Sequence, residues 1–490
     1  MKKVYLSKSK YCKAKQCNKI LWLEKFKEEE LIPTARESVL KTGIEVGEVA
    51  KGLFGEYIDI EFNKELSIMI EQTQEALNNK PNIIAEASFN YENNFCSIDI
   101  LKNDIDGFEI YEVKSSTEVK DIYLDDISYQ VYILLNLDYK VKSANIVHIN
   151  NEYVRNGDLE LSKLFKIENV TQIALEKQQE IKNKIEEINE YMQNEEEPEE
   201  TIGKQCFEPY KCEFWNYCTR GLPEKNVFLI NKMRTTKKLE LYNKGLYKYE
   251  DLVDEQLSER FKQQIEMDLY NKEPEIQKQE IKEFLDTLYY PLYFLDFETY
   301  AQAIPKYDGI RPYMQIPFQY SLHYLESETS ELKHKEFLAE PGVDPRRELA
   351  ERLVKDIPEN ACVLAYNKGF ENGVIQKLAI QYLDLSEKLL KISKNLKDLM
   401  IPFSKRMYYA KEMEGSYSIK EVLPALFPND EKLNHKNLEI VHNGEEAMSL
   451  YEGLEKRPKE EQEEIKKALL EYCKLDTLAM VKILEKLKQL

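Results

Sequence analysis

The chain has 490 residues, which is too long for one ordinary hydrophobic core and predicts two or three domains. Its 42% hydrophobic and 32% charged residues are typical of a globular protein. The sequence contains no uninterrupted run of about twenty apolar residues, which is the length that a membrane-spanning helix needs. A formal net charge of -20 argues against a surface covered with phosphate-binding lysine and arginine, although a local basic groove on an acidic protein stays compatible with it.

The opening segment, MKKVYLSKSKYCKAKQC, is basic but lacks the apolar stretch of a secretion signal. We therefore expect a cytoplasmic protein that does not contact a membrane. In that reducing compartment the eight cysteines should stay as thiols or bind metal, because disulfides rarely persist there. Their uneven placement along the chain favours metal for at least four of them.

Residues 82–150 alternate short apolar runs with turn residues, a pattern typical of strands, and Asp106-Gly107 between two runs predicts a hairpin. Glu112 and Lys114 are two apart on the second strand, so their side chains share one face, and the hairpin brings Asp99 beside them. Two carboxylates can hold Mg²⁺ or Mn²⁺, while an ammonium can orient water or stabilise a charged transition state. Solvated hairpin charges are the alternative interpretation.

This arrangement resembles the PD-(D/E)xK nuclease pattern. Two neighbouring segments extend the resemblance to RecB-like nucleases. LDDISYQVYILL predicts a helix carrying Gln130, which matches the glutamine that follows the catalytic lysine in that group. Upstream, KTGIEVGEVAKGLF predicts a helix carrying Glu48, where the group usually places a histidine or glutamate as an additional metal ligand. Glu45 is the alternative residue for this role.

A helix is predicted from about Gln172 to Gln193, and a cysteine cluster follows the acidic loop after it. Three cysteines in CFEPYKCEFWNYC together with one near the N-terminus resemble the 4Fe-4S arrangement of RecB-like nucleases; the implied ligands are Cys17, Cys206, Cys212 and Cys218. Such a cluster would tie the first helix to the end of the domain. A zinc site and buried thiols remain alternatives, and Cys12 competes with Cys17.

Residues 221–285 are charged and helical in pattern, which predicts a connector between a domain at 1–220 and a second α/β domain at 286–490. In the second domain, YFLDFETY places Asp296 and Glu298 two apart on an apolar strand, so both carboxylates project from one face. Buried carboxylates need metal or other partners.

Two further acidic motifs follow in the same domain. VLAYNKGFENGVI places Asn367, Phe370 and Glu371 after a short apolar strand, and LLEYCKLDTLAMVKIL predicts a helix with Tyr472 and Asp476 on one face. The order of these motifs resembles the tyrosine-containing DEDD exonucleases, except that Glu371 stands where an aspartate is commoner. Asp398, which lies between the second and third motifs, is expected either to bind substrate or complete the acidic site, or to cap a helix.

Taken together, the chain resembles a bacterial fusion of a RecB-like nuclease domain with a DnaQ-like exonuclease domain. The fold class implied is α/β: a restriction-endonuclease-like domain and an RNase H-like mixed-sheet domain joined by the helical connector. The resemblance implies a two-metal-ion nuclease with 3′-to-5′ exonuclease activity in the C-terminal domain and DNA, rather than RNA, as substrate. Two alternatives stay open. One is a 3′-to-5′ exoribonuclease whose N-terminal domain grips the strand, and the other is a non-catalytic nucleic-acid-binding subunit of a larger complex, with a helicase-like protein as its candidate partner.

Overall fold

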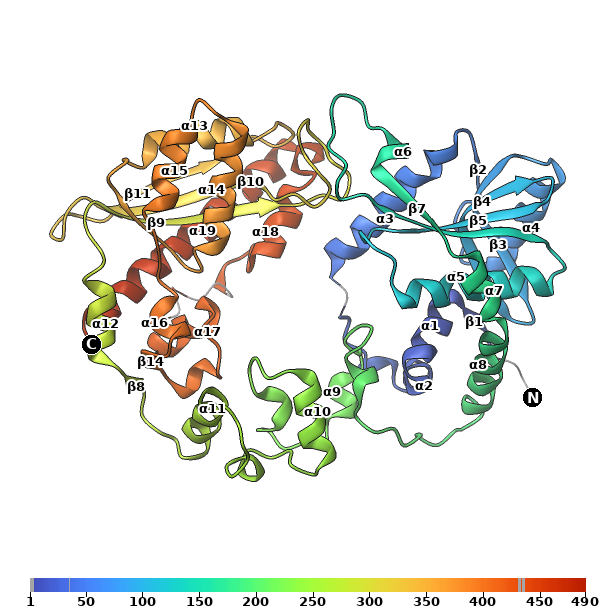
Figure 1. Ribbon diagram of the computed structural model, residues 1–490, viewed down its shortest axis with the longest axis horizontal. Coiled ribbons are helices and arrows are strands. Elements are labelled where there is room, and N and C mark those ends of the chain that lie inside the picture. The colour runs from blue at the N-terminus through green and yellow to red at the C-terminus, as the bar shows by residue number, and fades with distance from the viewer. Residues whose placement is uncertain (1–3, 35, 431–432, 434–436) are drawn as a thin grey trace. The chain divides into compact units, whose positions relative to one another are not determined.

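The computed structural model describes residues 4–34, 36–430, 433 and 437–490 (Figure 1). The chain forms two compact units, each of mixed α/β structure. The N-terminal unit runs to Leu222 and also contains Gln302–Met314, while the C-terminal unit consists of Pro223–Ala301 and Gln315–Leu490. The expected connector therefore belongs to the C-terminal unit, and a short segment from the expected C-terminal domain belongs to the N-terminal one.

The N-terminal unit is built on a seven-stranded mixed sheet in the order β2-β3-β4-β5-β6-β7, with β1 paired to β4. Strands β3, β4 and β5 are antiparallel, as the hairpin pattern predicts, whereas β6 runs parallel to β5 and β7 is antiparallel to β6. The strands are β1 (Leu6–Ser7), β2 (Ile58–Asp59), β3 (Ile83–Tyr91), β4 (Asn94–Asp104), β5 (Gly107–Lys114), β6 (Val141–Ile149) and β7 (Phe165–Asn169).

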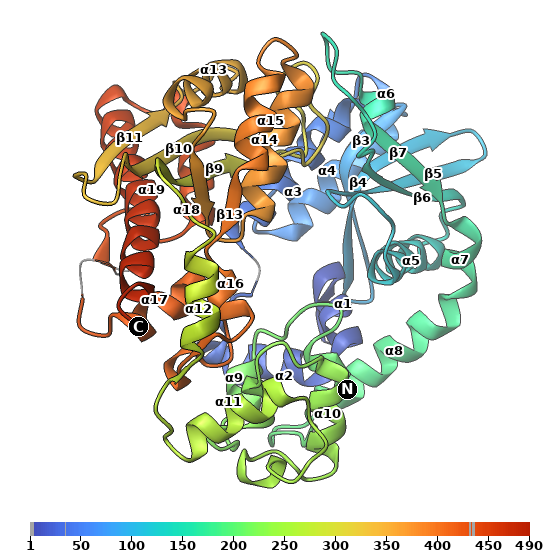
Figure 2. The ribbon, with the colours of Figure 1, turned by 60° about the vertical axis from the view of Figure 1, so that its left-hand side comes forward.

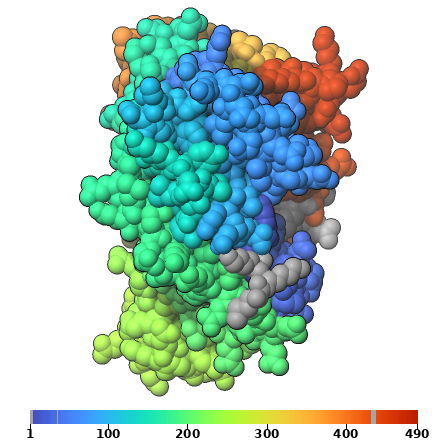
Figure 3. Space-filling model, turned by 90° about the vertical axis from the view of Figure 1, so that its right-hand side faces the viewer, coloured from blue at the N-terminus to red at the C-terminus, as the bar shows by residue number. Residues whose placement is uncertain are grey.

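Helices pack against this sheet through two apolar clusters. One cluster joins the sheet to helices that include α1, α4, α5 and α8, and the other joins it to α3 and Ala303. The helices are α1 (Lys8–Gln16), α2 (Asn18–Phe26), α3 (Glu37–Lys51), α4 (Leu66–Asn78), α5 (Asp121–Asn136), α6 (Leu161–Leu164), α7 (Thr171–Glu176), α8 (Gln178–Tyr191) and α9 (Trp215–Cys218). The helix expected over 172–193 is interrupted at Lys177. The blue to green atoms in Figure 3 show one face of this unit.

The C-terminal unit contains a five-stranded sheet in the order β11-β10-β9-β12-β13. Strands β10 and β11 continue from β9 in antiparallel pairing, whereas β12 and β13 are parallel to it. The strands are β9 (Leu292–Tyr300), β10 (Ile316–Leu325), β11 (Lys333–Leu338), β12 (Cys362–Ala365) and β13 (Leu396–Asp398). A separate pair is formed by β8 (Glu275–Ile276) and β14 (Tyr408–Tyr409).

The long helix α19 (Lys459–Leu487) packs along β9 and β10 (Figure 2). Residues 223–285 have a small apolar core of their own around Val227, Leu241 and Ile265. The other helices of the unit are α10 (Thr235–Asn243), α11 (Glu259–Leu269), α12 (Lys278–Leu285), α13 (Arg346–Asp356), α14 (Gly369–Gln381), α15 (Ser386–Lys394), α16 (Ile401–Ser404), α17 (Ile419–Leu426) and α18 (Gly444–Tyr451). Across the described ranges, no helix combines the length and apolar character needed to span a membrane.

Candidate metal centres

Three carboxylates of the C-terminal unit meet where β9 and α19 pack together. Asp296, Glu298 and Asp476 each present an oxygen within 4.8 Å of the others. The two-residue period of β9 places Asp296 and Glu298 on the same face, as the sequence predicts. The structure thus brings together residues from the first and third acidic motifs, which lie far apart in the chain.

Neighbouring strand β10 fixes the position of α19 against these carboxylates. Gln319 is opposite Glu298 in the register, and its Nε2 donates to the Leu469 carbonyl at 2.8 Å. Ser321 is opposite Asp296, and its Oγ is hydrogen-bonded to Thr477 Oγ1 at 2.7 Å. Two buried polar side chains therefore position the helix that carries Asp476. Sequence reasoning missed them because their partners lie about 150 residues away in the chain.

Burial and mutual repulsion make this cluster unfavourable to ionise. Desolvation, followed by the nearby charges of Asp476 and Glu298, raises the pKa of Asp296 well above its ordinary value. The same two effects, burial and then repulsion from Asp476 and Glu371, raise the pKa of Glu298 to about 8. A divalent cation between these oxygens would offset the repulsion, which is the electrostatic condition of a metal site.

Glu371, the acid of the second motif, lies in the first turn of α14 and is 3% exposed. Burial raises its pKa to about 8, and its Oε2 has no hydrogen-bond partner among the described residues. The loop before it is held by Asp398, whose Oδ1 accepts from the backbone N–H groups of Asn367 and Met400, both at 3.0 Å. Asp398 thus positions the motif, and the unsatisfied Glu371 oxygen remains free to bind a cation.

Tyr472 lies one turn before Asp476 on α19 and is buried. Desolvation and then the charges of Asp476 and Glu298 raise the pKa of its phenol, which stays protonated and able to donate a hydrogen bond. Cys473, which sequence reasoning did not single out, lies with its Sγ 3.6 Å from Asp296 Oδ2. Phe370, the aromatic residue of the second acidic motif, is 39% exposed.

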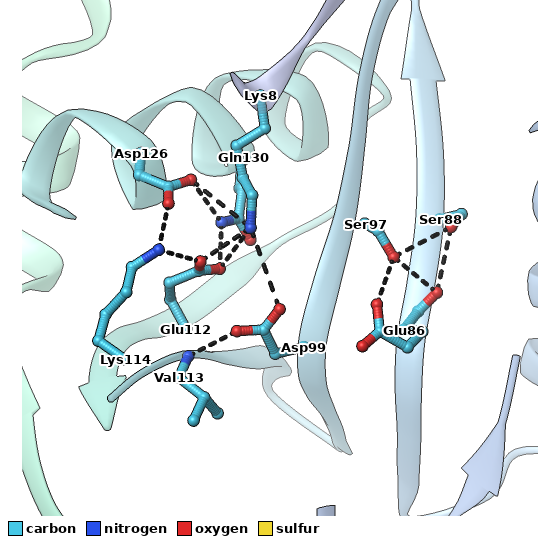
Figure 4. A network of polar contacts seen from close by, with 10 residues as sticks. All are labelled: Lys8, Glu86, Ser88, Ser97, Asp99, Glu112, Val113, Lys114, Asp126 and Gln130. Atoms are coloured by element: carbon cyan, nitrogen blue, oxygen red, sulfur yellow. Dashed lines mark hydrogen bonds and ion pairs between the residues drawn. The ribbon is translucent and has the colours of Figure 1, made fainter. Parts of the chain in front are cut away.

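The predicted residues of the N-terminal unit also come together (Figure 4). Lys114 Nζ donates to Glu112 Oε1 at 2.6 Å, and Gln130 Nε2 donates to Glu112 Oε2 at the same distance. Asp99 is fixed by the backbone N–H of Val113, which donates to its Oδ2 at 2.6 Å. Gln130 Oε1 is buried without a hydrogen-bond partner within the described part of the chain.

Two further charged residues belong to this cluster and were missed by sequence reasoning. Asp126 lies one turn before Gln130 on α5, and its Oδ2 accepts from Lys114 Nζ at 2.6 Å. Its four-residue spacing from Gln130 was an available signal. Lys8 donates to both Glu112 oxygens, at 2.8 and 3.0 Å, from 104 residues away, and no local pattern indicates that contact.

The pKa values of the two predicted metal ligands, Asp99 and Glu112, are shifted in opposite directions. Burial and then repulsion from Glu112 raise the pKa of Asp99 to about 7. Burial also opposes ionisation of Glu112, but the ammonium groups of Lys114 and Lys8 outweigh it and hold the pKa of that carboxyl well below its usual range. Glu112 is therefore the more readily ionised of the two carboxyls, and further positive charge nearby would favour the ionised form of Asp99.

Glu86 lies across from Asp99, between the paired positions Ala85↔Ile100 and Ala87↔Ile98. It has a left-handed φ of 56°, an uncommon and strained conformation for glutamate, and Ser97 Oγ donates to its Oε2 at 3.0 Å.

The predicted ligand Glu48 is on α3 as expected, but it is 60% exposed and pairs with Lys51 at 2.7 Å. Both glutamates line one pocket of about 490 Å³.

Four cysteines gather at the end of the N-terminal unit. The Cys212 N–H donates to the Cys206 carbonyl at 3.0 Å, and burial together with the nearby Cys206, Cys218 and Cys17 raises the pKa of Cys212 to about 11. Cys12 lies instead near the cluster that contains Asp126. The charges of Asp126, Lys114 and Lys8 all affect the pKa of its thiol. Cys17, rather than Cys12, is therefore the N-terminal cysteine that lies near Cys212. All eight cysteines are free thiols.

A family model described as a domain of unknown function (DUF2779) matches residues 293–418. That range includes Asp296, Glu298 and Glu371 but ends before Tyr472 and Asp476. No curated protein and no solved structure matches the chain.

Proposed function

We propose that this chain is a metal-dependent nuclease whose C-terminal unit removes nucleotides from the 3′ end of a nucleic acid strand. The observation that carries the proposal is the meeting of Asp296, Glu298 and Asp476 oxygens within 4.8 Å. Buried like charges are costly, and a cluster of them is typical of a site that holds divalent cations. The five-stranded sheet with three antiparallel strands and two parallel ones supports an RNase H-like fold for this unit.

The side chains have separate roles in this proposal. Asp296, Glu298, Glu371 and Asp476 would hold two Mg²⁺ or Mn²⁺ ions, which supply an activated water and stabilise the departing 3′ oxygen. Tyr472, protonated and beside these carboxylates, would donate its hydroxyl to orient the attacking water. Gln319 and Ser321 would hold α19 so that Asp476 stays in register with the β9 carboxylates.

The N-terminal unit would carry a second nuclease site of the PD-(D/E)xK type. Asp99 and Glu112 would bind the metal, and Lys114 would orient water or stabilise the transition state. The hydrogen bond from Gln130 to Glu112 supports this assignment, because it fixes one ligand by a side chain of the next helix. Glu86 fits the role of additional ligand better than Glu48, since it lies directly across from Asp99.

The substrate class is tested by digesting DNA and RNA strands of one sequence in parallel, each labelled at its 5′ end. We expect a ladder of shortened products with Mn²⁺, faster on DNA than on RNA, and no digestion with EDTA. A 3′-blocked DNA should resist the C-terminal site. Faster digestion of RNA would instead favour an exoribonuclease, and no digestion of any strand would contradict the nuclease proposal.

We propose a 4Fe-4S cluster on Cys17, Cys206, Cys212 and Cys218, supported by their proximity. A zinc ion with bonds of about 2.3 Å needs its sulfurs about 3.8 Å apart, and no three described cysteine sulfurs lie mutually within 4.8 Å. Anaerobically purified protein should be brown and hold about four irons per chain.

Replacing any one of the four cysteines with serine should lower the iron content and the thermal stability of the N-terminal unit. Cys96→Ser is the control for iron content, because Cys96 is a buried cysteine of the same unit that lies on β4 and is not one of the four. Stoichiometric zinc with negligible iron would contradict the proposal.

A further inference from the structure

Lys8 enters the N-terminal cluster from a well-anchored position. It is the first residue of α1, directly after β1, which pairs in parallel with β4. Tyr129 donates its hydroxyl to the Leu6 carbonyl at 2.9 Å, and this fixes the chain two residues before Lys8. Figure 4 shows the Lys8 and Lys114 side chains reaching the carboxylates from different segments; Lys8 begins α1 and Lys114 ends β5.

The Lys8 ammonium is surrounded by the three carboxylates of the cluster. Its Nζ lies 2.8 and 3.0 Å from the two Glu112 oxygens, 3.7 Å from Asp126 Oδ1 and 4.0 Å from Asp99 Oδ1. Lys114 contacts Glu112 and Asp126 but is not within ion-pair distance of Asp99 in any described pair. Of the two lysines, Lys8 is therefore the one that bridges Asp99 and Glu112.

Asp99 and Glu112 are also the two ligands assigned to a divalent metal. An ion bound to both, at the short oxygen distances of Mg²⁺ or Mn²⁺, would lie in the space between them that Lys8 Nζ now fills. An ammonium and a divalent cation a few ångströms apart repel each other strongly at a buried site. The two cations cannot share these carboxylates in the present geometry.

We propose that the Lys8 ammonium occupies the metal position of the N-terminal site as a counter-cation. Its side chain must leave this position before a divalent ion can bind there. This inference rests on the proposed nuclease function of that site. It implies that metal loading of the N-terminal site is weakened by competition with the Lys8 ammonium. Lys8 would thus set the metal concentration at which the N-terminal site becomes active.

The test measures Mn²⁺ binding by calorimetry to the full chain carrying Asp296→Asn and Glu298→Gln, so that the N-terminal site dominates the signal. Lys8→Met, which keeps the length of the side chain without its charge, should tighten Mn²⁺ binding by at least about tenfold. Lys8→Arg should stay weak because the positive charge remains. Lys10→Met is the matched control, since Lys10 is an exposed lysine on the same helix, and it should leave the affinity unchanged.

Thermal unfolding gives a second readout that does not depend on activity. Without metal, Lys8→Met should lower the Tm because three carboxylates lose a cation, and Mn²⁺ should raise its Tm by more than that of the parent. Unchanged or weaker Mn²⁺ binding in Lys8→Met would overturn the Lys8 inference while leaving the site intact, provided that Glu112→Gln abolishes binding. If Glu112→Gln has no effect on Mn²⁺ binding, the metal site itself is wrong, and the inference falls with it.

Discussion

Replacing Asp296 with Asn and Glu298 with Gln together is expected to slow 3′-to-5′ digestion by at least about a thousandfold, because both positions would lose the charge that holds metal. The amides keep the shape of the side chains, so the fold should persist. The same change removes repulsion among buried carboxylates, and burial together with this repulsion raises the pKa of Glu298 to about 8. The metal-free variant should therefore be at least as stable as the parent in a thermal melt, although it is inactive.

Single-turnover digestion of a 5′-labelled oligonucleotide with Mn²⁺ measures this effect. Tyr472→Phe should cost less than Asp476→Asn, since it removes only a hydroxyl that orients water. The losses should not add when carboxylate changes are combined, because one missing ligand already disables the metal pair. Digestion that is unchanged in the Asp296 and Glu298 double variant would show that the activity resides elsewhere.

The second large effect is expected at the N-terminal site. In protein that already lacks the Asp296 and Glu298 charges, Lys114→Met should lower the remaining nuclease activity at least about a hundredfold. The reason is that the Lys114 ammonium acts on the attacking water or on the transition state. Lys166→Met is the matched control, since Lys166 is an exposed strand lysine whose partner is Glu152. Cleavage of labelled duplex and single-stranded DNA provides the measurement.

Equal residual cleavage in Lys114→Met and Lys166→Met would show that the N-terminal cluster is not catalytic. Circular dichroism separates a loss of cleavage caused by the missing ammonium from a loss caused by unfolding. Loss of folded structure in Lys114→Met would point to a structural role for the ion pairs of Lys114 with Glu112 and Asp126.

Local periodicity was enough to predict the parts of both clusters that lie on one strand or one helix. The β4–β5 hairpin, the shared face of Asp296 and Glu298, and the helix carrying Tyr472 and Asp476 all follow from spacing within a few residues. Gln130 came instead from the resemblance to RecB-like nucleases, which place a glutamine on the helix after the catalytic lysine. These predictions needed no knowledge of tertiary packing.

What spacing could not predict depends on contacts between distant parts of the chain. Lys8 and Glu112 are joined across 104 residues, and the ligand-like position of Glu86 depends on a left-handed backbone at a strand position. Glu48 illustrates another limit, because its helix was predicted from the sequence but the pairing of its exposed side chain with Lys51 was not. The direction of a helical side chain is set by the surface on which the helix packs.

The assignment of Gln302–Met314 to the N-terminal unit was also beyond sequence reasoning. This segment has no strand of its own and is held by hydrogen bonds to the chain around Arg155. Arg155 Nη1 donates to the Pro305 carbonyl at 2.8 Å, and the Gly157 N–H donates to Asp308 Oδ1 at 2.8 Å. Such contacts carry no periodic signal, so the boundary drawn from composition left the segment in the C-terminal domain.

The most direct test of the central claim is a crystal structure of the full chain soaked in Mn²⁺, with anomalous difference density calculated for the metal. The account predicts two peaks among the carboxylates of Asp296, Glu298 and Asp476, with the buried Glu371 Oε2 as a further ligand. The same peaks should be absent from crystals of the Asp296→Asn and Glu298→Gln variant. Active protein whose Mn²⁺-soaked crystals show no metal at these carboxylates would contradict the account.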